Sequence, residues 1–148
     1  MTPADPLPTA EALAAIDRIK VLKARYFRLM DTKDWDGWGR LFTPDAEMDT
    51  SGEAGGRCVR GRDGIVAYVR GAVDPVTTVH HGHMPEITLT SPTTATGIWA
   101  MEDMLRFPEG MGIGSMHGYG HYHETYELHD GEWLIASTKL TRLRIDVS

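Results

Sequence analysis

The pattern of hydrophobic and polar positions divides the chain into a helical first half and a strand-rich second half. After a proline-containing start at residues 1–8, apolar residues recur every three or four positions. This spacing predicts an amphipathic helix over residues 10–31, with Thr9 as its N-terminal cap. Shorter stretches of the same kind predict two further helices, one within residues 34–42 and one over residues 62–73.

The second half has the residue types and the spacing of β-strands. From residue 77 onward, stretches rich in Val, Ile, Thr, Tyr and Trp are separated by turn signals at residues 91–92, 109–114 and 130–131. These boundaries predict four long strands in succession. Helices followed by a strand meander are typical of an α+β fold, in which N-terminal helices pack on a curved antiparallel sheet. Such a sheet, bent over its helices, forms a cone-shaped barrel that encloses a pocket.

Length, charge and cysteine content narrow the class of protein. The 148 residues suffice for one core, so we expect a single domain over residues 9–148 and a flexible arm at 1–8. A net charge of −6 without a Lys/Arg cluster argues against a nucleic-acid partner. The sequence has neither an apolar run approaching the roughly 20 residues that cross a bilayer nor the features of a secretory signal. With Cys58 as the single cysteine, we expect a cytoplasmic protein without disulfides or membrane contact.

A carboxylate interrupts the apolar face of one predicted strand, residues 97–107. With a period of two, Asp103 shares a face with apolar side chains, whereas Glu102 and Arg106 lie on the opposite face. The apolar members of this face are Trp99, Met101, Leu105 and Phe107. A charged group in such a setting needs a hydrogen-bond partner. We therefore expect Asp103 to be buried and paired; a bulge that turns it outward is the alternative.

Histidine is the expected partner of Asp103. The preceding strand carries the sequence VHHGHMPEI, which contains three of the chain's seven histidines. Alternation sends His80 and His81 to opposite faces, while a glycine and a proline leave the direction of His83 open. A carboxylate can fix the tautomer of a histidine and raise its basicity. We expect Asp103 to pair with His80, with His81 turned away and His83 at the rim of the pocket.

The histidines also offer a metal site as an alternative. His81 and His83 with Glu86 resemble part of a cupin ligand set, and His121 and His123 repeat the same spacing. Imidazole and carboxylate groups suit iron, manganese or zinc. The cupin spacing is incomplete, and cupins do not begin with three helices, so we expect no metal and assign His121 to the pocket or its rim. The sequence contains no nucleophile elbow, phosphate loop or dinucleotide fingerprint.

Three stretches together resemble a known family. They are AIDRIKVLKARYFRLMDTKDWDGWGRLFTPDAEM, HHGHMPEITLTSPTTATGIWAMEDML and TYELHDGEWLIASTKLTRLRI. They are similar to the SnoaL-like branch of the nuclear transport factor 2-like superfamily, and most similar to bile-acid dehydratase and scytalone dehydratase. The resemblance covers almost everything from residue 12 to 145 and implies a cone of helices and curved sheet around a deep pocket. The same fold hosts isomerases, epoxide hydrolases, cyclases and carriers, so it does not fix the reaction.

The resemblance to bile-acid dehydratase implies five catalytic residues at matching positions. They are a tyrosine, an aspartate, a histidine, the aspartate paired with that histidine, and an arginine: Tyr26, Asp31, His80, Asp103 and Arg142. Scytalone dehydratase is less similar, because its second histidine and further polar groups have no assigned counterpart in this chain. The methionine-rich and glycine-rich segment 109–120 also differs, which leaves the substrate open.

These residues predict a cofactor-independent lyase, most simply a dehydratase acting on a bulky hydroxylated aromatic or steroid-like molecule. His80, oriented by Asp103, would remove a proton, and Tyr26 would stabilise a developing oxyanion or the departing hydroxyl. Asp31 would hold water or the tyrosine, and Arg142 would support the carboxylates or the oxyanion. The side chains expected to line the pocket are Trp35, His83, Met84, Trp99, Met101, His121 and Tyr122.

Other functions of the same residues stay open at this point. A retro-aldol cleavage that releases formaldehyde, or a double-bond shift, would begin with the same kind of proton transfer. A small-molecule binding module without chemistry and a metal-dependent oxygenase are the alternatives from other classes. The open sheet and the family resemblance further predict a homo-oligomer, with a trimer favoured over a dimer.

Overall fold

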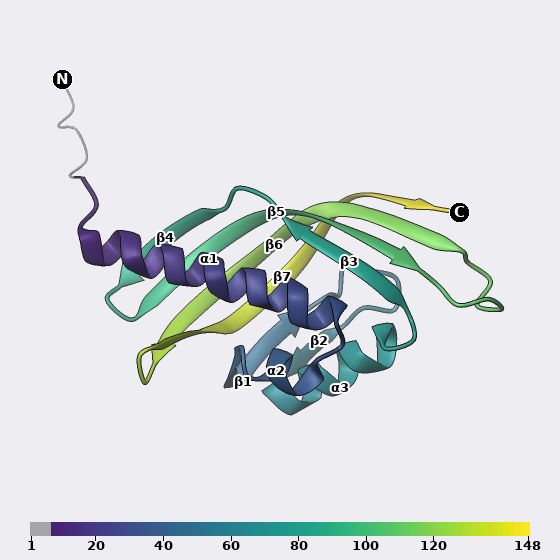
Figure 1. Cartoon of the computed structure of the whole chain (residues 1–148), viewed down its shortest axis with the longest axis horizontal. Coiled ribbons are helices and arrows are strands. Elements are labelled where there is room, and N and C mark those ends of the chain that lie inside the picture. The colour runs from purple at the N-terminus through teal and green to yellow at the C-terminus, as the bar shows by residue number, and fades with distance from the viewer. Residues whose placement is uncertain (1–6) are drawn as a thin grey trace, which may run out of the picture.

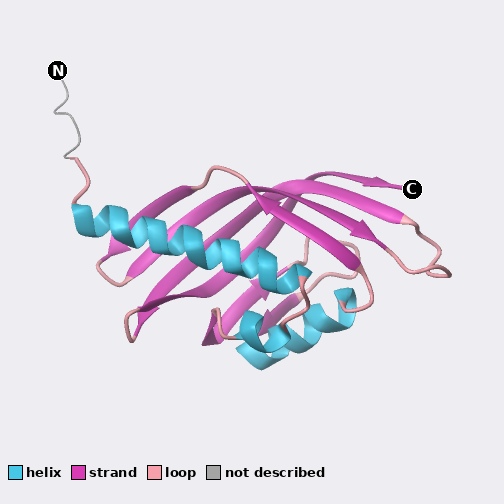
Figure 2. Cartoon of the chain, in the orientation of Figure 1, coloured by secondary structure: helices cyan, strands magenta, loops and turns pink. Residues whose placement is uncertain are grey.

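The computed structural model describes residues 7–148 as three helices on one side of a single curved sheet (Figures 1 and 2). The elements are, in order, α1 (Ala10–Asp31), α2 (Trp35–Gly39), β1 (Phe42–Asp49), β2 (Cys58–Arg60), α3 (Arg62–Val73), β3 (Thr77–Gly82), β4 (Glu86–Ser91), β5 (Thr94–Arg106), β6 (Ser115–His129) and β7 (Glu132–Val147). The flexible arm predicted at residues 1–8 lies outside the described residues except for Leu7 and Pro8.

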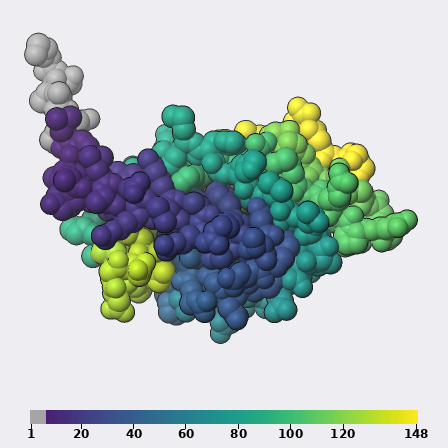
Figure 3. Space-filling model, viewed as in Figure 1, coloured from purple at the N-terminus to yellow at the C-terminus, as the bar shows by residue number. Residues whose placement is uncertain are grey.

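The long N-terminal helix forms as its sequence predicts. The side chain of Thr9 accepts a hydrogen bond from the backbone N–H of Ala12 at 3.1 Å, which caps α1. The apolar stripe of α1 packs mainly against β3 and carries Tyr26 inward. The stripe also contains Lys23, a fully buried charged residue that the pattern did not predict. In the space-filling view, the purple and dark blue N-terminal part of the chain covers the middle of the visible face (Figure 3).

The two shorter helices cover the other part of the sheet. Asp34 caps α2 by accepting a hydrogen bond from the backbone N–H of Gly37 at 2.9 Å. The third helix, α3, has the predicted bounds, and its Ile65 is fully buried. Because α3 packs on β1 and α2, its inner side faces the same surface of the sheet as the end of α1.

The sheet is open and mixed rather than purely antiparallel. Its strand order is β2-β1-β7-β6-β5-β3, and β4 pairs with another part of β5. The expected α+β architecture of helices on a curved sheet is confirmed, but the pairing of β1 with β7 is parallel. This departure arises because β1 joins the sheet beside the last strand of the chain and not beside the strand that follows α3.

The histidine-rich stretch VHHGHMPEI spans two strands, so five strands follow residue 77 where four were predicted. The strand is interrupted at residues 83–85, between β3 and β4, where Pro85 has no N–H to donate to the sheet. Gly82 ends β3 with the ring of Phe27 so close that a Cβ atom would collide with it. The backbone N–H of His83 still donates to the carbonyl of Ala100 at 2.8 Å, which keeps the segment against β5.

The core fills one end of the space between the helices and the sheet. Its fully buried large side chains include Ile19, Trp38, Phe42, Ile65, Tyr126 and Ile135. At the other end the long strands β5, β6 and β7 extend past the helices toward the C-terminus (Figure 1). Within residues 7–148, no helix has the length and apolar character needed to cross a membrane.

Candidate active site

A cavity of about 150 Å³ opens between α1, α3 and the inner face of the sheet. Four of the five predicted catalytic residues line it: Tyr26, His80, Asp103 and Arg142. Much of the remaining wall is apolar and comes from Met30, Met48, Val69, Ala72, Val73, Leu105, Met116 and Leu140. An apolar cavity with a few convergent polar groups is the usual form of a small-molecule site.

The fifth predicted residue, Asp31, lies directly behind His80. As the last residue of α1, Asp31 accepts hydrogen bonds from the backbone N–H of His80 at 2.9 Å and from the hydroxyl of Thr78 at 2.9 Å. Its carboxylate also lies 2.7 Å from Nδ1 of His80. Burial alone would raise the pKa of Asp31, but the hydrogen bonds from His80 and Thr78 outweigh burial and lower it. Asp31 is therefore ionised at neutral pH.

The contact with Asp31 decides which nitrogen of His80 can act as a base. An ionised carboxylate only accepts hydrogen bonds, so Nδ1 of His80 must carry the hydrogen. In a neutral imidazole the lone pair then resides on Nε2. The side chain of His80 is 7% exposed and lines the cavity, so this lone pair is the basic group available to a bound molecule.

The predicted pairing of His80 with Asp103 is wrong. The two residues are direct partners in the register of β3 and β5, as strand alternation implied. Asp103, however, is buried in a bidentate ion pair with Arg142, whose Nη1 and Nη2 each donate to one carboxylate oxygen at 2.8 Å. The guanidinium offers two parallel N–H groups that match a carboxylate, which one imidazole cannot do. Asp31 consequently replaces Asp103 as the partner that orients the histidine.

Arg142 joins Asp103 to a second carboxylate, which the sequence did not reveal. Its Nε donates to Glu53, a residue of the glycine-rich turn that follows β1. Burial alone would lower the pKa of Arg142, but the bonds to Asp103 and Glu53 raise it, so the guanidinium stays charged. Gly118 on β6 leaves room for this ion pair, because a Cβ atom there would collide with both Arg142 and Asp103. A glycine inside a strand was the available signal for such a close approach.

Three tyrosines line the cavity, and two of them, Tyr26 and Tyr122, are buried; the hydroxyl of the third, Tyr68, lies 2.8 Å from that of Thr50. The positions of the two buried tyrosines agree with the placement of Tyr26 in the site and of Tyr122 in the pocket. Burial raises the pKa of Tyr26 far above its ordinary value of 10.0, and the negative charge of Glu124 raises it further. Burial likewise raises the pKa of Tyr122. Both phenols therefore remain protonated at any physiological pH and can donate hydrogen bonds.

Several predicted pocket residues lie elsewhere on the buried side of the molecule. Trp99 is buried in the core, where its indole N–H donates to the hydroxyl of Tyr126 at 2.8 Å. Met101 lies beside Arg142, with its sulfur 3.7 Å from Nη1, but does not line the cavity. These two share the inner face with Asp103 as alternation predicts, but β5 is longer than the cavity, so only some of its inward residues reach it.

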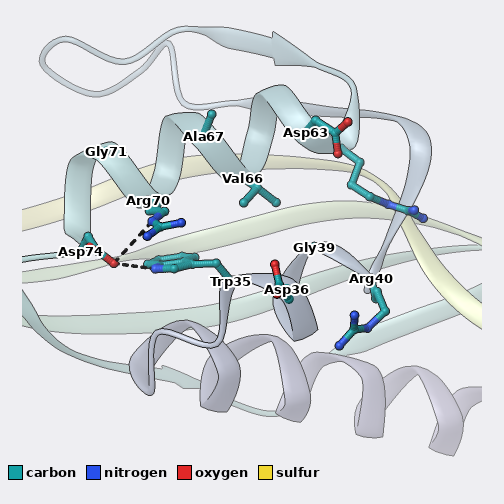
Figure 4. Close-up of a pocket in the computed structure, with 11 residues that line it drawn as sticks. Trp35, Asp36, Gly39, Arg40, Asp63, Val66, Ala67, Arg70, Gly71 and Asp74 are labelled. Atoms are coloured by element: carbon teal, nitrogen blue, oxygen red, sulfur yellow. Dashed lines mark hydrogen bonds and ion pairs between the residues drawn. The ribbon is translucent and has the colours of Figure 1, made fainter.

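Trp35 lines a different depression, a groove of about 670 Å³ between α2 and α3 (Figure 4). There its indole N–H donates to Asp74 at 2.6 Å, and Arg70 approaches the same carboxylate at 3.9 Å. Most charged side chains along this groove are solvated, and Asp36, Arg40 and Asp63 are all exposed. Without a buried titratable group it offers little for acid-base chemistry, and the central cavity is the candidate site.

The remaining predicted pocket residues lie on the outer side of the sheet or in its loops. Met84 is 93% exposed in the break between β3 and β4, so it cannot line the cavity. His83 and His121 both belong to the outer face, where His83 contacts Glu102 at 3.3 Å and His121 packs beside His123. The prediction that these two histidines line the pocket is wrong. On β6, strand alternation directs Tyr122 and Glu124 into the core and therefore His121 outward. His83 lies after the end of β3, on the same side of the sheet as Glu102.

Glu102 gathers three histidines on this outer face. Its carboxylate lies 2.9 Å from Nε2 of His117, 3.3 Å from Nε2 of His83 and 3.6 Å from Nδ1 of His81. Hydrogen bonds from His117, followed by those from His81 and His83, lower the pKa of Glu102. Within the described residues 7–148, no three or more His, Cys, Asp or Glu side chains are arranged to hold a metal ion, neither here nor at the predicted His-x-His pairs.

Comparisons with known proteins agree with the fold and with the family resemblance. Residues 11–139 match the sequence profile of the SnoaL-like domain. A protein of Gibberella zeae named "Probable cyclase FGR4" is 28% identical over 142 residues, which cover 90% of this chain and 92% of that protein.

Solved structures share the fold at lower sequence identity. A Novosphingobium aromaticivorans protein assigned by name to the scytalone dehydratases has a TM-score of 0.85 at 21% identity, covering 95% of this chain and 92% of its own. The hexachlorocyclohexane dehydrochlorinase LinA-type3 of Novosphingobium barchaimii LL02 has a TM-score of 0.80 at 20% identity, covering 93% and 92%. At this level of identity the likeness extends to the fold alone. The profile match covers most of the chain, and the protein is a member of the SnoaL-like family.

Proposed function

We propose that this protein is a cofactor-independent lyase, most simply a dehydratase, that acts on an uncharged hydroxylated ring compound. The observation that carries the proposal is the buried pair of His80 and Asp31, 2.7 Å apart, which leaves Nε2 of His80 as a base at the cavity. The protonated hydroxyl of Tyr26 lines the same cavity as an acid partner. A base and a hydrogen-bond donor in one cavity are the minimum for an elimination.

In the proposed reaction, Nε2 of His80 removes a proton from a carbon next to a carbonyl or a conjugated acceptor. The electron pair of that C–H bond forms the new double bond, and the C–O bond to the departing hydroxyl breaks. The departing hydroxyl takes up the proton that His80 removed and leaves as water, while a hydrogen bond from Tyr26 stabilises the negative charge that develops on oxygen. Asp31 stabilises the imidazolium that His80 becomes. General acid-base catalysis of this kind contributes about 10² to 10⁴ in rate.

The charges around the cavity favour an uncharged substrate. Three carboxylates, Asp49, Glu53 and Asp103, line the cavity; Lys139 pairs with Asp49 at 3.3 Å, and Arg142 pairs with the other two. An anionic substrate would meet three carboxylates and would lack a free cation to bind it, because these cations are already engaged. Arg142 is therefore assigned to the cavity wall and to the orientation of Asp103, not to an anionic group of the substrate.

The size of the cavity limits how much of the substrate it can hold. An apolar cavity of about 150 Å³ accommodates one benzene-sized ring. The ring that carries the hydroxyl would occupy this space, surrounded by the methionine and leucine side chains of the wall. A fused-ring or steroid-like substrate would have to extend beyond it, so we favour compounds of one or two rings among the hydroxylated molecules considered.

A product screen tests this proposal. The purified protein is incubated with uncharged hydroxy ketones and hydroxylated arenes of one to four rings, and the products are analysed by mass spectrometry. Loss of the mass of water supports the dehydratase, loss of the mass of formaldehyde indicates carbon–carbon cleavage, and an unchanged mass with a new absorption spectrum indicates isomerisation. The control is His80→Ala. Binding without any conversion, or equal conversion by the folded His80→Ala variant, would refute the lyase proposal.

We further propose that the protein assembles as a homotrimer. The outer face of the sheet carries half-exposed side chains, among them Ile98, and no helix of residues 7–148 covers it. A curved sheet with such a face is suited to packing against further copies of itself. Light scattering coupled to gel filtration should give three times the mass of the chain, and the mass of a single chain would contradict the proposal.

A further inference from the structure

A second polar group lies deeper in the fold, behind the two buried tyrosines of the cavity. Lys23 is one helical turn before Tyr26 on α1, and its ammonium contacts the carboxylate of Glu124 on β6 at 2.6 Å. Both side chains are 0% exposed. Neither residue lines the cavity, so the pair acts on a bound molecule only through the residues around it.

The ammonium group of Lys23 lies against the rings of both buried tyrosines of the cavity. Its Nζ is 3.8 Å from the ring centroid of Tyr26 and 3.8 Å from that of Tyr122. A cation over the face of an aromatic ring is attracted by the ring's negative face, and more strongly when water is excluded. One buried charge therefore holds both rings, and with them the directions of their hydroxyls.

The carboxylate of Glu124 is fully engaged on its other sides. It accepts a hydrogen bond from the hydroxyl of Tyr126 at 2.6 Å and another from Thr138 at 3.0 Å. Tyr126 in turn accepts from the indole N–H of Trp99 at 2.8 Å. These contacts fix the carboxylate, and the carboxylate fixes the ammonium group beneath the tyrosines.

Stability alone gives little reason for such a pair. Removing two charges from water is costly, and apolar side chains of similar volume in their place often leave a protein as stable or more stable. Burial lowers the pKa of Lys23, whereas the charge of Glu124 and its hydrogen bond at 2.6 Å oppose this and favour the ammonium form. The place of the pair, against the two buried tyrosines of the cavity, points to a role in the site.

We propose that Lys23 is a positioning residue, which holds Tyr26 and Tyr122 so that their hydroxyls donate hydrogen bonds into the cavity, and that Glu124 keeps Lys23 in its charged form. The catalytic meaning of this inference rests on the function proposed above, because a well-placed Tyr26 matters there for the departing hydroxyl. The positioning itself concerns binding and holds whether or not the protein performs that reaction.

A pair of ring probes that differ in one group tests the positioning without a substrate. Cyclohexanone offers an oxygen that can accept a hydrogen bond from a tyrosine, and methylenecyclohexane has nearly the same shape without an acceptor. Affinities are measured by NMR titration for the wild type, Lys23→Met/Glu124→Leu and Tyr26→Phe. The double substitution replaces the ion pair by apolar side chains of similar length, and circular dichroism together with the affinity for methylenecyclohexane checks that the fold and the cavity are kept. The variant Glu124→Gln is the second test, since it removes only the charge that sustains Lys23.

We expect the double variant and Glu124→Gln to lose about tenfold in affinity for cyclohexanone, as Tyr26→Phe does, because one hydrogen bond is worth about that factor. Affinity for methylenecyclohexane should change less than about twofold, since the apolar wall is untouched. An unchanged affinity for cyclohexanone in these variants, or an equal loss for both probes, would overturn the proposal. So would a wild type whose cyclohexanone affinity does not depend on the Tyr26 hydroxyl.

The same variants separate a failure of this inference from a failure of the proposed function. If no hydroxylated compound is converted by the wild type while the selective loss of cyclohexanone binding is seen, the lyase proposal fails and the positioning role stands. Where a substrate is found, the double variant should lower kcat about tenfold with little change in KM, because the Tyr26 hydrogen bond strengthens as charge develops. Full kcat in the double variant would refute the positioning role even though the lyase proposal survives.

Discussion

His80 and His81 are adjacent residues of β3, and each lies near a carboxylate, but they face opposite sides of the sheet. On the inner side, the side chain of His80 is 7% exposed, and its Nδ1 lies 2.7 Å from Asp31. On the outer side, the side chain of His81 is 53% exposed, and its Nδ1 lies 3.6 Å from Glu102. The same pair of residue types thus occurs twice, once shielded from water and once in contact with it.

The comparison shows that the environment, more than the residue pair, makes an acid-base site. Asp31 serves one histidine, and its backbone and side-chain hydrogen bonds fix the imidazole in one orientation. Glu102 is shared among three histidines, so none of them has a partner of its own. Water also screens the charges on the outer face. Only the inner histidine meets a cavity in which a substrate could lose its own hydration.

Replacing the two histidines in turn should give the largest difference between the faces. With a substrate in hand, His80→Ala should lower kcat/KM by about 10² to 10⁴, because the proposed general base is lost. His81→Ala should leave kcat/KM within about twofold, since its side chain does not reach the cavity, and serves as the matched control from the same strand. Steady-state kinetics measures both. Equal losses in the two variants, with the fold intact by circular dichroism, would place the base elsewhere.

The division of residues between the two faces could be predicted from the sequence, and the partners across the fold could not. A period of two was enough to place His80 and Asp103 inward and His81 outward. Asp31 joins His80 only because the end of α1 docks against β3, 49 positions along the chain, and periodicity within one element carries no information on such docking. Glu53 reaches Arg142 from a turn, where no period applies.

The architecture was largely predictable, whereas the extent of the cavity was not. Strong local signals, such as the Thr9 cap and the apolar stripe of α1, gave α1 and α3 their observed bounds. The second helix ends at Gly39, and Phe42, which was predicted to belong to it, begins β1.

A bulge in β7 shows why the finer detail was missed: Arg142 and Arg144 are two apart, but the register with β6 shifts between Tyr119 and Gly120. Arg142 therefore lies in the cavity wall, whereas Arg144 lies near the ring of Tyr119 on the outer face. Bulges of this kind depend on the partner strand.

The two arginines of β7 test whether an ion pair on the inner face of the sheet contributes more stability than one on the outer face. Arg142→Met leaves Asp103 buried without its partner, which should cost about 3 kcal/mol in the free energy of unfolding. Arg144→Met removes an exposed pair with Asp146 and should have no measurable effect. Urea denaturation of both variants measures the difference. Comparable midpoints for the two would mean that the inner ion pair adds nothing to stability.

Two glycines sharpen the same contrast with a smaller change, the addition of one methyl group. Gly118→Ala puts a Cβ atom into the side chains of Arg142 and Asp103, and overpacking of this kind costs about 1 to 3 kcal/mol. Gly71→Ala on α3 meets no atom within 4 Å and should stabilise the helix by about 0.5 to 1 kcal/mol. Thermal unfolding of both variants shows whether each substitution raises or lowers the stability of the protein. A stabilised Gly118→Ala variant would show that the ion pair has room to move.

Acid titration should reveal the smallest difference, that between Asp31 and Glu102. Hydrogen bonds outweigh burial to lower the pKa of Asp31, and hydrogen bonds led by that of His117 lower the pKa of Glu102. A carboxylate whose pKa is lowered by folding stabilises the protein above its unfolded pKa, and this stability disappears as the pH falls through the lowered value. For Asp31 the loss begins near its ordinary pKa of 3.8 and continues below it.

Asp31→Asn should therefore be less stable than the wild type at neutral pH and lose less stability on acidification. The same comparison with Glu102→Gln should show a weaker effect, because water screens that carboxylate. Urea midpoints measured between neutral pH and about pH 3 test both expectations. An equally steep acid dependence in wild type and Asp31→Asn would mean that the bond from His80 does not stabilise the ionised carboxylate, and the inner histidine would then have no more of a dedicated partner than the outer one.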